Sequence, residues 1–169
     1  RPDMYRIVAV VFFLGAGLAA SAAPTGEGDY INRFSGAWAG TGTLIKTVPL
    51  QVSCKASGAP GENRITIDGD CSLAIASVKI GADITFDPST GRYSGTYIGA
   101  RVGPARVSGT RNGDVVNLVI TWPKPVQGDT RASMIIENAG AGHLRIVIND
   151  NVTPGGPEQL TSDMSLTHI

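Results

Sequence analysis

The segment FSGAWAGTGT, from Phe34 to Thr43, is the most informative part of the chain for its fold. From Phe34 to Gly42 every second residue is aromatic or glycine, and a period of two is typical of a β-strand. Glycines on the inner face of a strand let it bend sharply or let a neighbouring backbone approach, while Trp38 fills the space at one end. The stretch therefore predicts the first strand of a small closed β-barrel, with Trp38 at its floor.

Beyond this strand, short runs of alternating apolar and polar residues are separated by glycine, proline, asparagine and aspartate. Such repeated alternation predicts antiparallel strands joined by tight turns, so that consecutive strands are neighbours in a meander. Two longer connections, 123–130 and 151–158, should form loops at the barrel mouth. We place ten strands near residues 35–46, 48–56, 64–71, 77–86, 92–99, 105–111, 115–122, 131–137, 143–149 and 160–168.

Each predicted strand has one apolar face and one polar face, because side chains alternate across a strand. The apolar set begins with Val48 and Leu50 on the second strand and includes Leu160, Met164 and Leu166 on the last. Every ionisable residue that we place on a strand is expected on the outer, solvated face. The sequence therefore predicts an interior without fixed charge.

These features predict an all-β protein with a single antiparallel up-and-down β-barrel of about 8–10 strands, formed by residues 34–169 after an N-terminal tail, 24–33. A closed barrel avoids exposed strand edges. A two-sheet sandwich is the alternative arrangement.

The Gly36-x-Trp38 start, with the meander after it, resembles the lipocalin and calycin barrels. The F-S-G-x-W-x-G strand and the cysteine pair on the next two strands also resemble small uncharacterised periplasmic proteins of proteobacteria. The lipocalin resemblance implies an arginine that closes over the tryptophan, which is matched to Arg131 or Arg145, although the threonine-aspartate-tyrosine turn of that family is absent from the sequence. Avidin shares the start as well, but its site uses several tryptophans, and with Trp38 and Trp122 alone this chain is not expected to bind biotin.

Residues 1–23 are predicted to be a signal peptide, because Arg6 precedes an apolar run, 7–18, and Ala20-Ser21-Ala22 has the small-x-small pattern of a cleavage site. The alternative is an uncleaved membrane anchor, although the run is short for a membrane span. A cleaved chain would be periplasmic or secreted, without a membrane anchor.

Because exported compartments are oxidising, we expect a disulfide between Cys54 and Cys71 rather than two free thiols. The two cysteines lie 17 positions apart, and a disulfide that closes this loop would stabilise the fold by roughly 3 kcal/mol.

The composition argues against several functions. The chain carries 14 basic and 14 acidic residues, so it lacks the excess of positive charge that is typical of nucleic-acid-binding proteins. No common catalytic motif occurs, and the two histidines, His143 and His168, are expected on the surface, so we predict no enzyme, no metal and no cofactor. The clusters 68–70 and 149–151 offer oxygen atoms for calcium, but are interpreted as residues that cap turns.

The interior is where a function is expected. The inward glycines either leave a cavity or merely allow tight coiling around a packed core, and the sequence leaves both open. If a cavity exists, we expect a small hydrophobic, uncharged or weakly polar guest, bound without metal, with hydroxyls of Tyr93, Tyr97 and Ser162 adding specificity; a charged head group would stay at the mouth, near Arg101 or Lys124. The candidate ligand-binding residues are Trp38, Phe86, Tyr97, Trp122 and Met134.

Two alternatives belong to other classes of protein. Secreted metalloprotease inhibitors are small disulfide-bonded barrels that insert an N-terminal tail into the protease cleft, and residues 23–31 would be such a tail here. The second alternative is a structural envelope protein. In each case we expect a monomer.

Overall fold

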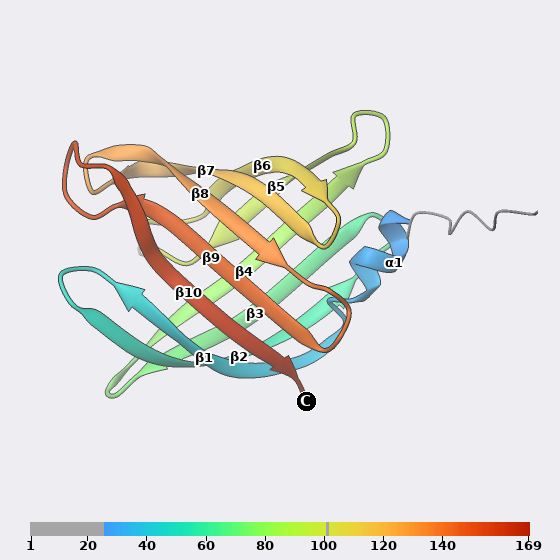
Figure 1. The fold of residues 1–169 in the computed structure, drawn as a ribbon, viewed down its shortest axis with the longest axis horizontal. Helices are drawn as coiled ribbons and strands as arrows, with labels where there is room; N and C mark the ends of the chain where they lie inside the picture. The colour runs from blue at the N-terminus through green and yellow to red at the C-terminus, as the bar shows by residue number, and fades with distance from the viewer. Residues whose placement is uncertain (1–25, 101) are drawn as a thin grey trace, which may run out of the picture.

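The computed structural model describes residues 26–100 and 102–169 and shows a closed barrel of ten antiparallel strands (Figure 1). Consecutive strands are paired, and the last strand returns to pair with the first. This closure excludes the sandwich. No described helix is long and apolar enough to cross a membrane. The elements are α1 (Glu27–Asn32), β1 (Gly36–Ile45), β2 (Pro49–Pro60), β3 (Arg64–Leu73), β4 (Ala76–Asp87), β5 (Arg92–Ile98), β6 (Ala105–Asn112), β7 (Val115–Val126), β8 (Asp129–Glu137), β9 (His143–Asn151) and β10 (Glu158–His168).

All ten predicted strands are present, and the main difference lies in one connection. Residues 123–130 were expected to form a loop, but β7 continues to Val126 and a two-residue turn leads into β8. Pairing between the two strands lapses after Thr121 and resumes at Val126, and Pro123 and Pro125 lie within that gap. Since proline has no N–H to donate, the unpaired stretch is where a strand tolerates it.

The alternation of buried and exposed residues follows the prediction along most strands, with corrections near the mouth. Leu160 is 39% exposed because a register shift between Leu160 and Ser162 reverses the parity of β10 at that point. Val48 and Leu50 are 59% and 38% exposed, because they lie at the β1–β2 hairpin, beyond the packed interior.

The prediction of an interior without ionisable groups is wrong at two positions. Arg111 follows Ala105, Val107 and Gly109 on the inward parity of β6, and its side chain is mostly buried. Asp150 follows Leu144, Ile146 and Ile148 on the inward parity of β9 and is also buried. These two residues lie toward opposite ends of the barrel, and their surroundings differ.

The end that holds Arg111 is closed by α1, which lies across it (Figure 1). Part of the predicted tail is thus folded: Tyr30 and Ile31 on the helix and Phe34 after it are fully buried. The Tyr30 ring packs edge-on against Phe34 and lies beneath the guanidinium groups of Arg33 and Arg111. A helix this short is not stable alone in water, so packing against the barrel must hold it in place.

Polar groups at the closed end are paired with one another. Arg111 binds the Glu27 carboxylate with nitrogen–oxygen distances of 2.7 and 2.9 Å, and the Tyr93 hydroxyl donates to the same carboxylate. Burial opposes ionisation of Glu27, but the hydrogen bonds from Arg111 and Tyr93 outweigh it and lower the pKa of that carboxyl. Arg33 likewise binds Asp114 at 2.6 Å and the backbone oxygen of Asn138 at 2.9 Å.

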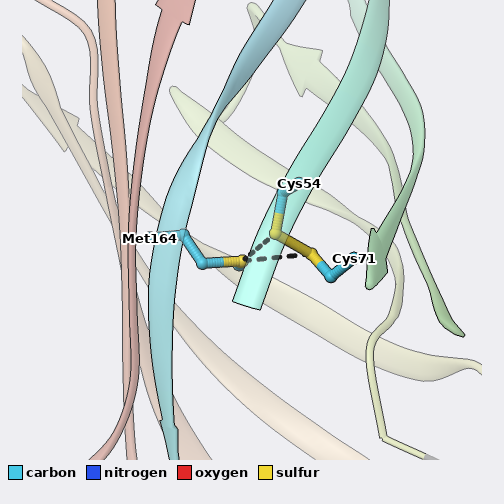
Figure 2. The surroundings of a disulfide bond; sticks show 3 residues. All are labelled: Cys54, Cys71 and Met164. Atoms are coloured by element: carbon cyan, nitrogen blue, oxygen red, sulfur yellow. Dashed lines mark hydrogen bonds between the residues drawn. A yellow bond between two sulfur atoms is a disulfide. The ribbon is translucent and has the colours of Figure 1, made fainter. Parts of the chain in front are cut away.

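The expected disulfide is present between β2 and β3 (Figure 2). Cys54 and Cys71 are directly opposite in the register, and their Cα atoms are 4.1 Å apart. Both side chains are buried inside the barrel wall, and the Sδ atom of Met164, on β10, lies 3.9 Å from each sulfur. The disulfide therefore joins neighbouring strands and is itself part of the core.

Candidate ligand cavity

A cavity of about 360 Å³ lies toward the end of the barrel opposite α1. Its walls include Leu44, Ile80, Ile148 and Met164 from four strands, and Cys71 of the disulfide. Residues of the loops and hairpins at this end, among them Lys46, Gln127 and Val152, complete the lining, so the cavity reaches the barrel mouth. Volumes of this order are at the small end of the range for ligand sites.

Asp150 is the charged side chain buried in the cavity wall. Its Oδ2 accepts a hydrogen bond from the Trp122 indole N–H at 2.9 Å, and its Oδ1 accepts one from the backbone N–H of Asn151 at 2.7 Å. Burial raises the pKa of this carboxyl, although these two hydrogen bonds favour the ionised form, and the nearby carboxylates of Asp129 and Glu158 raise the pKa further. The interpretation of 149–151 as a turn cap is wrong for Asp150, because the residue lies in β9 and faces inward.

Two hydroxyl groups expected to add specificity also line the cavity. The Ser162 Oγ is buried and has no hydrogen-bond partner among the described residues. Tyr97 is buried, which raises the pKa of its hydroxyl, and its ring lies 6.1 Å from that of Trp122 at an angle of 52°. The third residue, Tyr93, binds Glu27 at the closed end instead.

Of the five candidate ligand-binding residues, Tyr97 and Trp122 line the cavity. Trp38 lies toward the closed end, where its indole N–H donates to the Phe34 oxygen at 3.2 Å, and Phe86 packs against Tyr93 near α1. Met134 is buried in the barrel wall opposite Leu118 on β7 and Ile148 on β9, outside the cavity lining. The structure thus brings two of the five together.

The arginine matched to the lipocalin pattern is not seen over Trp38. Arg145 pairs with Asp163 on the outer surface, and Arg131 is exposed. The aromatic group that packs edge-on against Trp38 is His168, at 5.2 Å. Arg101, named as a candidate mouth residue, lies outside the described residues, as does the predicted signal peptide.

The inward glycines differ in what lies against them. A Cβ at Gly95 would lie 1.9 Å from the backbone oxygen of Asp83, and one at Gly109 would lie 1.8 Å from the backbone oxygen of Asn117. These glycines therefore allow neighbouring strands to coil closely. Gly99 differs, because a Cβ there would lie 1.9 Å from the Tyr97 hydroxyl. That glycine makes room for a side chain that lines the cavity.

The geometry defines the class of the fold: a closed, ten-stranded, up-and-down antiparallel barrel with one plugged end and a cavity toward the other. The structure is similar to the crystal structure of Rv2717c from M. tuberculosis, with a TM-score of 0.64 and 15% sequence identity over 85% of this chain and 97% of that chain. At this identity the similarity concerns the fold alone. No protein-family model and no curated protein matches the sequence.

Proposed function

We propose that this is an exported, non-enzymatic β-barrel protein that binds a small, largely apolar molecule in its cavity. The observation that carries the proposal is the cavity itself, about 360 Å³, with aliphatic walls and a few converging polar groups. Concave apolar sites with a few polar anchors are the usual form of small-molecule sites. The uneven filling of the barrel, packed toward α1 and hollow toward the mouth, supports the same assignment.

Export is supported by the disulfide and by the sequence of residues 1–23. A disulfide between buried cysteines is compatible with an oxidising compartment. A periplasmic or secreted carrier would meet its ligand outside the cytoplasm. A monomer would suffice to bind it, because the ligand would enter through the open end of a single barrel.

The alternative, a protease inhibitor acting through its N-terminal tail, receives less support. Residues 27–31 of that tail lie in α1, and the apolar side chains of Tyr30 and Ile31 are buried against the barrel. An inhibitor or interaction role would therefore depend on the mouth loops, where Val48 and Ile75 are well exposed.

Native mass spectrometry of protein purified from its own compartment tests the proposal. We expect a small molecule that stays bound in the native protein and is released on denaturation. Val78→Trp should abolish this species because the larger side chain fills the cavity, whereas Val119→Trp, the same change on an exposed position of β7, should retain it. A wild-type protein that carries and takes up no small molecule, or a Val78→Trp variant that keeps its ligand, would contradict the proposal.

A further inference from the structure

We propose that Asp150 and Ser162 form the polar end of the cavity and select a guest that carries a protonated amine on an apolar body. The inference rests on the proposed function and names the class of molecule that the site takes. It replaces the expectation of an uncharged guest, which depended on an interior without ionisable groups.

The Asp150 carboxylate has acceptor capacity left for a guest. Each of its oxygens accepts one hydrogen bond, from Trp122 and from Asn151, whereas a carboxylate has about four acceptor positions. The residue lines the cavity and is only 3% exposed. A donor group in the cavity can therefore reach an oxygen that the protein itself has not saturated.

Asp150 also lacks a positive partner among the described residues. It takes part in none of their ion pairs, whereas the other inward ionisable residue, Arg111, binds Glu27 directly. A buried charge is costly unless it is paired. The nearby Asp129 and Glu158 carboxylates add negative potential, and Lys46 is the described cation in the cavity lining. A cationic guest would supply the missing partner.

Ser162 provides a second, independent sign of an unfilled polar site. Its hydroxyl is buried, lines the cavity and has no partner among the described residues. Ser162 is paired with Ile148 across β9 and β10, and Asp150 is the next inward residue after Ile148 on β9. The hydroxyl and the carboxylate thus belong to adjacent inward positions, and a buried hydroxyl without a partner leaves a desolvation cost that a bound N–H would remove.

The remaining walls fit such a guest. The Trp122 indole is hydrogen-bonded to Asp150, the Tyr97 ring lies 6.1 Å from the Trp122 ring, and aromatic faces attract ammonium groups. Ile80, Leu44 and Met164 offer aliphatic surface for the guest's body. An anionic guest would be repelled by the Asp150 carboxylate. The cavity volume favours a short alkyl amine or a single-ring amine over a long lipid.

The test compares octylamine, octanol and octanoate by isothermal titration calorimetry at neutral pH. Because a hydrogen bond to a charged group is stronger than one between neutral groups, octylamine should bind about tenfold more tightly than octanol, and octanoate should bind most weakly. Asp150→Asn should weaken octylamine about tenfold and change octanol by less than about threefold. Asp68→Asn, the same change at an exposed outer position, should leave the preference intact.

Two further readouts remain useful if Asp150→Asn folds poorly, since the amide can accept only one of the two hydrogen bonds. Ser162→Ala should weaken octylamine about threefold without lowering the melting temperature. In the wild type, octylamine affinity should rise as pH rises and Asp150 ionises. Asp129, Glu158 and Lys46 are the other charged groups near this site, and octylamine itself stays protonated over the range.

The outcomes separate this inference from the proposed function. Binding of octanol or octanoate as tight as that of octylamine, or octylamine binding that Asp150→Asn leaves unchanged, would overturn the amine selectivity while the cavity remained a binding site. If none of the three probes binds, the inference is also overturned, and the proposed function is then judged by native mass spectrometry of the wild type and the Val78→Trp variant.

Discussion

The two ends of this barrel are built from the same alternating strands but treat their buried polar groups differently. At the closed end, Arg111 enters the interior and meets Glu27, and Arg33 meets Asp114 and Asn138. Toward the mouth, Asp150 enters the interior and takes part in none of the ion pairs among the described residues, and the Ser162 hydroxyl has no hydrogen-bond partner among them.

This contrast indicates different roles for the two ends of the barrel. A polar group that serves the fold is expected to be satisfied within the protein, because leaving it unpaired costs stability. The closed end follows this rule. The mouth end departs from it beside a cavity, which is the combination expected where a ligand completes the site.

The largest expected effect tests whether the closed end holds the fold together. Trp38→Ala should lower the free energy of unfolding by about 3–5 kcal/mol, because the side chain is almost completely buried and its loss leaves a large cavity. Urea denaturation followed by circular dichroism measures the effect. An unchanged midpoint would show that Trp38 does not pack in the core.

The second effect concerns the ion pair that fastens α1. Glu27→Gln should cost about 2 kcal/mol in the same assay, because it leaves the largely buried Arg111 without its counter-ion. Asp83→Asn is the control: it breaks an ion pair with Arg64 in which both side chains are exposed and should cost less than about 1 kcal/mol. Equal costs for the two variants would contradict the conclusion that the Glu27–Arg111 ion pair fastens α1 to the barrel.

The pH dependence of stability should have opposite signs at the two ends. The pKa of Glu27 is lowered by folding, so its contribution is present above its unfolded pKa of about 4.3 and is lost as pH falls through the folded value. The pKa of Asp150 is raised, so its contribution is complete below its unfolded pKa of about 3.9 and is lost as pH rises through the folded value.

Chemical denaturation of the wild type, Glu27→Gln and Asp150→Asn across the acidic range measures this contrast. On acidification, the wild type should lose stability relative to Glu27→Gln and gain stability relative to Asp150→Asn. The same sign for both comparisons would mean that the two carboxyl groups have similar surroundings.

The smallest expected effect is that of Ser162→Ala on the free protein. Removing a hydroxyl that has no partner should leave the unfolding free energy unchanged or raise it by up to about 1 kcal/mol. A clear loss of stability in thermal denaturation would show that the hydroxyl is bonded in the free protein and is not held ready for a ligand.

The sequence predicted the architecture because the barrel is made of regular alternation. The ten strands and their order follow from period-two patterns and turn residues. The Cys54–Cys71 disulfide followed instead from the predicted export of a chain with two cysteines. The helix α1 was missed because six residues with two adjacent apolar side chains, Tyr30 and Ile31, give no helical period. Its stability comes from tertiary packing, which no local pattern shows.

The site was predicted in part, and the sequence also held the signal that would have identified Asp150. Tyr97 and Trp122 were found because large aromatic residues on an inward parity are visible in the sequence. Asp150 was missed because Asn149-Asp150-Asn151 has the composition of a turn, although extending the parity of Ile146 and Ile148 by one step places it inside. The sequence could not show which inward residues surround the cavity and which pack against one another. That depends on how the strands coil and on where α1 lies, and no local sequence pattern shows either.

The contrast between the two ends is tested most directly by the two indole N–H signals in a nuclear magnetic resonance titration with octylamine. The protein has two tryptophans: the Trp122 N–H binds Asp150 in the cavity wall, and the Trp38 N–H binds the Phe34 oxygen toward the closed end. We expect added octylamine to shift the Trp122 signal in a saturable way and to leave the Trp38 signal in place. A saturable shift of Trp38 alone, or no shift of Trp122 at saturating octylamine, would contradict this expectation.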